Sequence, residues 1–374
     1  MKLLVTSDLH LSDRIWRHRP IEGDSYYAWQ QIVAIAQEHQ VDGVILAGDI
    51  LDKQANLATP IQKLAHGLSE LADAGIKVFY TQGQHEYQEQ PWAALSPSTV
   101  WLHQNRIQTR EGWTILGNDY QNEEQLQKFL KHPSTATADI LVCHQVWLDY
   151  MGETGKPQGS FADLPPEVRY LITGDYHVHR LDQFGTLTVL SPGSTHLRSI
   201  SEPVDKFVFL MELGAHDQPA KITSLPLQSR RVIAVSAEDV SDFKKLKEQV
   251  QTQVDQAIAY ADEHELPVAL MKPLIRLTHR KDQPELVRQF QKTFAETGHL
   301  FYKQCRTATA DDEPEILDHI DAGDRIGMLN CLDHYLDPQK QELTYALALS
   351  LLQSPDPEQA LHRWIQEQLH TTPV

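Results

Sequence analysis

Short apolar runs alternate with longer stretches of helical period through the first half of the chain. Runs of four or five mostly apolar residues predict buried strands, and they lie at Lys2–Thr6, Gly43–Ala47, Lys77–Thr81, Thr114–Gly117, Asp139–Cys143 and Tyr170–Thr173. Apolar residues at helical spacing predict helices over Tyr26–His39 and Pro60–Ala74. Strands and helices that alternate in this way are typical of a layered α/β core.

From about Arg230 the pattern changes to that of a smaller α/β module. Its predicted strand, long helix, strand, helix and strand lie at Val232–Val235, Ser241–Glu263, Leu270–Leu277, Gln283–Thr297 and Leu300–Gln304. The rest of the chain opens on the acidic stretch Asp311–Asp324 and carries helical patterns at Leu343–Leu352 and Pro357–Leu369. We therefore expect three domains: a core over residues 1–228, the small module over 229–306 and a helical tail over 307–374.

The formal net charge of −18 argues against a protein that binds nucleic acid by charge alone, because phosphate contacts need lysine and arginine. The charge is uneven: residues 307–374 hold 13 acidic and 3 basic side chains and so carry −10 of it. The tail therefore exaggerates the acidity of the preceding residues. An acidic, amphipathic tail fits a protein-binding role better than a DNA-binding one.

Three cysteines, Cys143, Cys305 and Cys331, are too few and too scattered for a disulfide framework or a zinc cluster. They suit a reducing compartment. The N-terminus reaches a charged residue too early for a signal-peptide core, and no later run approaches the roughly 18 apolar residues that span a bilayer. We expect a soluble, cytoplasmic protein without a membrane segment.

Polar side chains follow the predicted strands, at the point where each strand ends. Asp8 and His10 are two residues apart, so in an extended segment they face the same side. Alone, this pair is better explained as a polar strand end. Four more segments follow later strands in order, with the candidate side chains Asp49, Asp52, Gln84, His85, His144, His177 and His179. Because the carboxyl ends of strands in open α/β sheets form binding crevices, we expect one shared site.

Mixed carboxylate, imidazole and amide ligands suit Mn²⁺, Fe²⁺ or Zn²⁺ better than Ca²⁺, which prefers oxygen cages. The candidate ligands include no thiolate, which argues against a structural zinc site. We expect divalent metal ions, with manganese as the metal of activity.

The ordered set DxH, GDxxD, GxH[DE], H and HxH, over about residues 1–200, resembles the calcineurin-like metallophosphoesterases. Within them, the opening DLHLSDR and the later SPGSTHLRSISE at Ser191–Glu202 resemble the SbcD-type DNA repair nucleases, in cellular or phage versions. The resemblance implies an α/β fold with a four-layer α/β/β/α core, in which helices flank a two-sheet sandwich. A small α/β capping domain, which would bind DNA, and a helical C-terminal tail would follow this core.

The resemblance also implies two metal ions that share Asp49. One would be held by Asp8, His10, Asp49 and His179, and the other by Asp49, Gln84, His144 and His177. His85 would stabilise the transition state or protonate the leaving oxygen, with its imidazole oriented by Asp52. Taken alone, His85 would be interpreted as a loop histidine that caps a helix.

Two positions depart from the family pattern. Gln84 stands where the family usually has Asn, which places the amide oxygen one methylene further out. The family's GHxH is replaced by the run from Gly174 to His179, GDYHVH. Asp175 in this run reads either as a group that orients a ligand histidine or as a turn residue.

The resemblance implies DNA as substrate and an SMC-like ABC ATPase, SbcC, as the partner that docks on the tail. It further implies a homodimer, formed through the helices around Pro60–Ala74 and Gln90–Leu95. Candidate phosphate contacts are Arg14, Arg17, Arg19 and Arg198. A solvated loop explains the first three equally well.

The resulting hypothesis is a manganese-dependent DNA exonuclease and endonuclease, the nuclease subunit of an SbcCD-like repair and recombination complex. One alternative is a metallophosphatase or small-molecule phosphodiesterase of the same superfamily. Another is a catalytically impaired scaffold that recruits the ATPase, an alternative raised by Gln84 and the acidic charge.

Overall fold

The computed structural model describes residues 1–12, 21, 23–53, 58–87, 91–152, 155–199, 202–238, 240 and 243–305. The chain divides into two compact units, Met1–Arg306 and Thr307–Val374. The second unit, with its predicted tail helices, lies outside the described residues. Among those residues, no helix is both long enough and apolar enough to cross a lipid bilayer.

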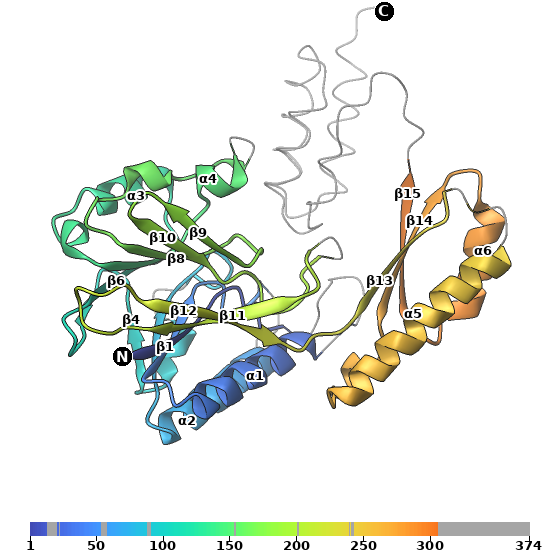
Figure 1. Ribbon diagram of the computed structural model, residues 1–374, viewed down its shortest axis with the longest axis horizontal. Coiled ribbons are helices and arrows are strands. Elements are labelled where there is room, and N and C mark those ends of the chain that lie inside the picture. The colour runs from blue at the N-terminus through green and yellow to red at the C-terminus, as the bar shows by residue number, and fades with distance from the viewer. Residues whose placement is uncertain are drawn as a thin grey trace, which may run out of the picture. The chain divides into compact units, whose positions relative to one another are not determined.

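The first sheet has six strands in the order β12-β11-β1-β2-β3-β4. The strands β1 to β4 are parallel, and β11 and β12 join as antiparallel neighbours at one edge. Their bounds are β1 Lys2–Thr6, β2 Gly43–Ala47, β3 Lys77–Thr81, β4 Thr99–Trp101, β11 Lys206–Glu212 and β12 Lys221–Leu227. Helices α1 (Asp24–Glu38) and α2 (Ala58–Asp73) cover its outer face (Figure 1).

The second sheet also has six strands, in the order β5-β6-β7-β8-β10-β9. Their bounds are β5 Arg106–Gln108, β6 Thr114–Asn118, β7 Ile140–His144, β8 Tyr170–Gly174, β9 Arg180–Phe184 and β10 Leu187–Ser191. Helices α3 (Glu123–Leu130) and α4 (Leu148–Met151) lie against its outer face (Figure 1). The 3₁₀ helices η1, η2 and η4 lie at Trp92–Leu95, Thr135–Thr137 and Phe161–Asp163.

The two sheets pack face to face through their apolar side chains. Leu3, Val5 and Ile45 from the first sheet belong to one buried cluster with Ile140 and Val142 from the second. Separate buried clusters join each sheet to its own helices. The layers therefore run helix, sheet, sheet, helix, which confirms the predicted four-layer α/β/β/α core.

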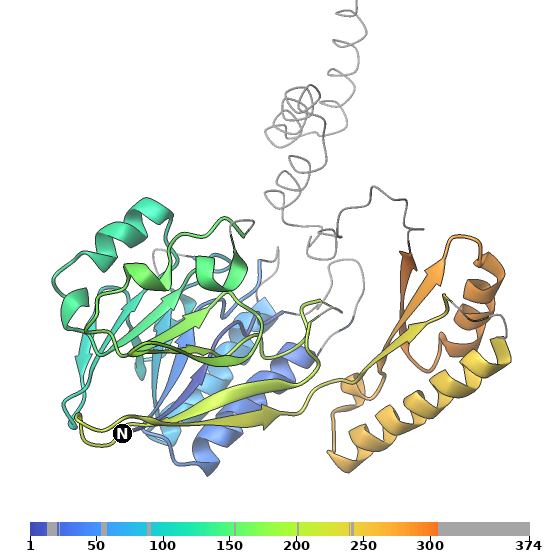
Figure 2. The ribbon, with the colours of Figure 1, turned by 45° about the horizontal axis from the view of Figure 1, so that its top comes forward.

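A third, three-stranded parallel sheet follows in the order β13-β14-β15. Its elements are β13 Val232–Ser236, α5 Phe243–Glu263, η5 Val268–Leu270, β14 Leu274–Arg280, α6 Pro284–Phe294 and β15 His299–Cys305. Both helices pack on one face of this sheet (Figure 2). Arg230, just before β13, forms a buried ion pair with Asp24 of α1 at 2.7 Å.

Most of the predicted elements are present, with shifts of a few residues at their ends. β1, β2 and β3 have the predicted bounds. The six strands β4, β5 and β9 to β12, which complete the two large sheets, were not predicted. The division at residues 228 and 306 into three functional domains stays a prediction.

Candidate metal centre

The polar segments that follow β1, β2, β3, β7 and β8 meet at one place between the sheets. Asp8, His10, Asp49 and His144 are each no more than 1% exposed. Among the described residues, three overlapping groups could hold a cation: Asp8 with His10 and His177, Asp8 with Asp49 and His144, and His10 with Asp52 and His85. The sheet topology therefore brings together the segments that the sequence predicted to share one site.

Four of these positions have a backbone conformation that side chains disfavour. Asp8, His10, Asp49 and Asp175 have φ angles of 50°, 40°, 48° and 77°, in the left-handed region. Backbone hydrogen bonds hold the first two, from Asp8 N to Gly48 O at 3.0 Å and from His10 N to Asp49 O at 2.8 Å. The segments are thus turned sharply so that their side chains converge.

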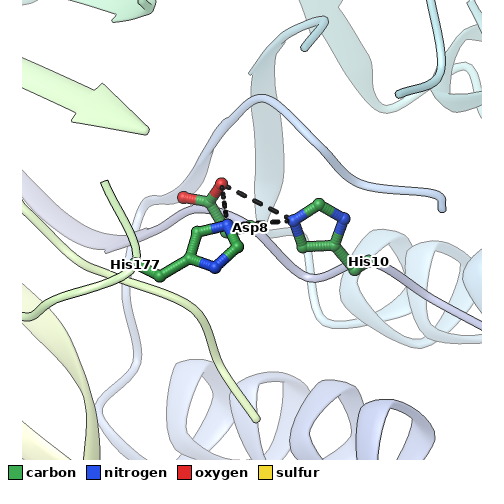
Figure 3. A group of neighbouring side chains, drawn as sticks. All are labelled: Asp8, His10 and His177. Atoms are coloured by element: carbon green, nitrogen blue, oxygen red, sulfur yellow. Dashed lines mark hydrogen bonds and ion pairs between the residues drawn. The ribbon is translucent and has the colours of Figure 1, made fainter. Parts of the chain in front are cut away.

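One cluster of donor atoms is formed by Asp8, His10 and His177. The Nε2 atoms of His10 and His177 lie 3.3 Å apart, and His177 Nε2 is 3.5 Å from Asp8 Oδ1. Figure 3 shows the two rings and the carboxylate facing one another. Two imidazole nitrogens at this separation, beside a carboxylate, are arranged as ligands of a single cation.

A second cluster adjoins the first through Asp49. Asp49 Oδ2 lies 3.4 Å from His144 Nε2 and 3.5 Å from His10 Nε2, so it stands between the two clusters. His144 contacts Ala47 O through Nδ1 at 2.8 Å, which directs its Nε2 toward the carboxylates. That Nε2 is buried and has no hydrogen-bond partner. The position of Asp49 is the one required of a shared ligand.

Gln84 and Asp175 lie beside the second cluster. Gln84 Nε2 donates to Asp175 Oδ1 at 2.5 Å, and Asp175 Oδ1 is 3.8 Å from His144 Nε2. Gln84 Oε1 is buried without a partner. A close backbone approach is needed here, because a Cβ on Gly83 would lie 2.0 Å from Asp49 Oδ1. The longer amide of Gln84 thus contacts Asp175 beside the cluster.

His179, a predicted ligand, lies apart from the two donor clusters in this structure. Its Nδ1 contacts Pro192 O at 3.0 Å and its Nε2 contacts Ser224 Oγ at 2.8 Å, so neither nitrogen is directed to the carboxylates. His177 instead joins Asp8 and His10, the cluster assigned to His179. The physical reason lies in the backbone after Gly174: the turn there presents Asp175 and His177 to the clusters, whereas His179 lies directly before β9, which begins at Arg180. Had the GHxH pattern been aligned on Gly174, the sequence would have indicated this pair.

His85 forms a chain with Asp52 and Arg198. His85 Nδ1 lies 2.7 Å from Asp52 Oδ1, and Arg198 donates to both oxygens of Asp52 at 2.8 and 3.2 Å. Burial alone would raise the pKa of Asp52, but His85 and Arg198 hold it well below the usual range. Asp52 is therefore an ionised acceptor that fixes the ring of His85, while His85 Nε2 lies 3.8 Å from Asp49 Oδ2.

Arg198, the predicted phosphate contact, is bound within the site in this structure, and its contact with phosphate stays a prediction. Its side chain is only 10% exposed and its guanidinium is bound to Asp52. Arg14, Arg17 and Arg19 lie outside the described residues.

Sequence reasoning gave no individual role to Glu202 and Lys206. Glu202 Oε1 lies 2.9 Å from His177 Nδ1, and Lys206 Nζ donates to Glu202 Oε2 at 2.9 Å. The carboxylate orients the His177 ring, as outer-shell carboxylates do for metal-binding histidines. Glu202 ends the segment SPGSTHLRSISE, so that motif was the available signal.

The charge balance of the site fits divalent cations. Burial alone would lower the pKa of His177, but Asp8 and Glu202 raise it to about 10. Burial would likewise lower the pKa of His144, which Asp49 and Asp8 instead raise well above its ordinary value. Protons on these rings thus balance the buried carboxylates, and divalent cations would do so more fully. The unpartnered His144 Nε2 and Gln84 Oε1 supply further donors.

The fold and these clusters define a class of protein, the metal-dependent phosphoesterases. Residues 1–179 match the family of calcineurin-like phosphoesterases, so the chain carries a domain of that family, as the resemblance predicted. Divalent metal ions are therefore its expected cofactors.

The chain is also similar to three curated relatives named DNA double-strand break repair protein Mre11. The protein of Methanosarcina mazei is 24% identical over 68% of this chain and 43% of its own length. The Methanosarcina acetivorans protein is 25% identical over 54% and 35%, and that of Sulfurisphaera tokodaii is 23% identical over 67% and 70%. The match thus spans less than half of either Methanosarcina protein.

Among solved structures, a dimetal phosphatase from Danio rerio matches 60% of this chain and 95% of its own at 10% identity. Its TM-score of 0.38 is too low to carry an argument about the site.

Proposed function

We propose that this protein is a metal-dependent DNA phosphodiesterase that acts as an exonuclease and endonuclease. The observation that carries the proposal is the pair of donor clusters joined by Asp49, with the His85–Asp52 pair at their edge. The similarity to relatives named for DNA double-strand break repair favours DNA over other phosphate esters. Manganese is the proposed metal, because it accepts imidazole and oxygen ligands together.

In this proposal the residues of the site are either metal ligands or the proton donor. Asp8, His10, His177 and Asp49 would hold one cation, and Asp49, His144 and Gln84 the other. Bound cations supply the positive charge that polarises a phosphodiester and its attacking water. Among the residues of the site, His85, His144 and His177 are each oriented by a neighbouring acceptor.

His85 is the proposed acid. Its Nδ1 is fixed by Asp52, so its Nε2, near Asp49, is the nitrogen that would give a proton to the leaving oxygen. Arg198 keeps Asp52 ionised and in place, so the carboxylate remains the acceptor that orients the ring. The imidazole is 20% exposed, so a substrate can approach it.

The test compares wild type with His85→Asn in Mn²⁺-dependent cleavage of linear duplex DNA. We expect the rate to fall by about 10²–10⁴-fold, the usual contribution of a general acid, with unchanged Mn²⁺ binding. His66→Asn is the matched control, because His66 is a 71% exposed histidine on α2. Equal background cleavage by wild type and variant would overturn the proposal. Hydrolysis of an aryl phosphate without DNA cleavage would favour a metallophosphatase instead. Activity on neither substrate would favour a scaffold.

We further propose that the chain is the nuclease subunit of an SbcCD-like repair complex and forms a homodimer. The acidic tail over residues 307–374 would bind an SMC-like ATPase, while Arg14, Arg17 and Arg19 and the module 229–306 would contact DNA. Capture of the ATPase by the full chain, lost when the tail is removed, supports this assignment. Capture that persists without the tail contradicts it.

A further inference from the structure

The loop after β8 presents a carboxylate at the second donor cluster. We propose that Asp175 is a direct ligand of the second metal ion, together with Asp49, His144 and Gln84. We further propose that this carboxylate makes the second site select Mn²⁺ over Zn²⁺. The inference rests on the proposed two-metal centre and names the chemistry of its second site.

The position of Asp175 is fixed from three sides. Its Oδ1 accepts from Gln84 Nε2 at 2.5 Å and lies 3.8 Å from His144 Nε2. Its backbone N–H donates to the Asp8 carboxylate, at 3.2 and 3.3 Å from the two oxygens. The side chain is 12% exposed and faces the cluster. The carboxylate thus lies among groups that come from the ends of three other strands, β1, β3 and β7.

Two buried atoms without a hydrogen-bond partner lie beside this carboxylate, one of them 3.4 Å from Asp49 Oδ2. His144 is fully buried, and its Nε2 has no hydrogen-bond partner. Gln84 Oε1 is also buried without one. Leaving a buried polar atom unpaired is costly, so two such atoms at one place require an explanation. One cation that binds the imidazole nitrogen, the amide oxygen and the carboxylate oxygen satisfies all three groups.

An orienting role for Asp175 fits the geometry less well. A carboxylate that orients a metal-binding histidine accepts from the ring nitrogen that faces away from the metal. His144 already uses that nitrogen, Nδ1, on Ala47 O, and His177 uses its Nδ1 on Glu202. Asp175 Oδ1 instead approaches His144 from its Nε2 side. That is the ligand side of the ring.

The consequence of a carboxylate here is a change in metal preference. With Asp175 the second set has two carboxylates, one amide oxygen and one imidazole. Oxygen-rich sets suit Mn²⁺ and Mg²⁺, whereas imidazole-rich sets suit Zn²⁺. The two donor clusters therefore differ in character: the first contains two imidazoles and the second only one.

The test measures bound metal directly, by equilibrium dialysis and electron paramagnetic resonance of Mn²⁺, on wild type, Asp175→Asn and Asp175→His. We expect two Mn²⁺ per wild-type chain and, in Asp175→Asn, a second site weakened at least about 10-fold. Asp175→His should keep two sites but shift the competition between Zn²⁺ and Mn²⁺ toward Zn²⁺ by a similar factor. The exposed Asp217→Asn is the matched control and should bind like wild type.

Unchanged Mn²⁺ affinity at both sites in Asp175→Asn would overturn the inference. A wild-type chain that binds only one Mn²⁺, with the same affinity as Asp175→Asn, would also overturn it. Circular dichroism of each variant excludes loss of metal through unfolding, and Asp175→His provides a second, folded comparison. The result is separable from the proposed function. A fall from two bound Mn²⁺ in wild type to one in Asp175→Asn supports the ligand assignment, even where wild type fails to cleave DNA.

Discussion

At the scale of single residues, one metal-facing histidine in each cluster is held by its own acceptor. His144 is fixed by a backbone carbonyl, that of Ala47, and His177 by the carboxylate of Glu202. The buried Lys206 in turn balances Glu202. These contacts determine which ring nitrogen faces the cluster, so the ligands are oriented before any cation binds.

Arg198 offers a residue-scale test of this preorganisation. Arg198→Met removes both hydrogen bonds to Asp52, so His85 loses the support of its acceptor. We expect kcat for DNA cleavage to fall about 10–100-fold, with little change in KM. Arg198→Lys should restore little, because an ammonium cannot reproduce the two-pronged contact. A raised KM with unchanged kcat would instead make Arg198 a DNA contact.

At the scale of elements, the ends of β8 and β2 leave no space for a further side chain beside His144. A Cβ on Gly174, the last residue of β8, would lie 2.3 Å from Ala47 O and 2.4 Å from His144 Nδ1. These atoms form the hydrogen bond that orients His144. The close approach of β8 to β2 therefore depends on the absence of a side chain.

Gly174→Ala should lower the free energy of unfolding by about 1–3 kcal/mol, the usual range for overpacking a core. It should also weaken binding at the second metal site. The control is Gly214→Ala, because a Cβ there meets nothing within 4 Å; its effect should stay within about 0.5 kcal/mol. Urea denaturation without metal and Mn²⁺ dialysis measure the two effects. Equal stability of both variants would show that β8 can shift away from β2.

The predictable part of the fold comprises elements with strong local patterns. β1 to β3 are short apolar runs with polar ends, which is why their bounds were predicted. β9 escaped prediction because most of its residues are exposed and it carries no alternating pattern. β11 is different, since Phe207–Met211 is as apolar as the predicted strands. It was missed because a strand that returns antiparallel breaks the expected alternation of strands and helices.

The site was predictable as a set of segments but not as a set of contacts. Asp8, His10, Asp49 and His144 follow strand ends, and the sheet brings them together. Which histidine of the HxH pair faces inward depends on a turn at Asp175 with a φ of 77°, which no periodicity indicates. The partners of Arg198 are likewise distant in sequence.

At the scale of the whole molecule, a buried ion pair connects the core to the small three-stranded sheet. Arg230 donates to both oxygens of Asp24 on α1 and also to Lys272 O, just before β14. Burial raises the pKa of Asp24 in spite of this contact with Arg230. The pair therefore adds little net stability, whereas either charge alone would be poorly solvated.

Arg230→Met should lower the free energy of unfolding of the whole chain by about 3–5 kcal/mol, because it leaves Asp24 buried without its partner. Adding Asp24→Leu should recover most of that loss. Denaturation in urea, followed by circular dichroism, measures the single and double variants. Additive losses from the two substitutions would show that the two charges are not coupled, and would contradict their mutual neutralisation.

The left-handed backbones of Asp8, His10, Asp49 and Asp175 have a consequence for how this protein evolves. A residue with a side chain in that conformation is disfavoured by about 1–2 kcal/mol, so the centre is sustained by the stability of the rest of the fold. Selection for thermal resistance alone, in the absence of metal, would replace these residues with glycine or asparagine. Inactive descendants of this chain should therefore tend to have a higher thermal stability than their active ancestor.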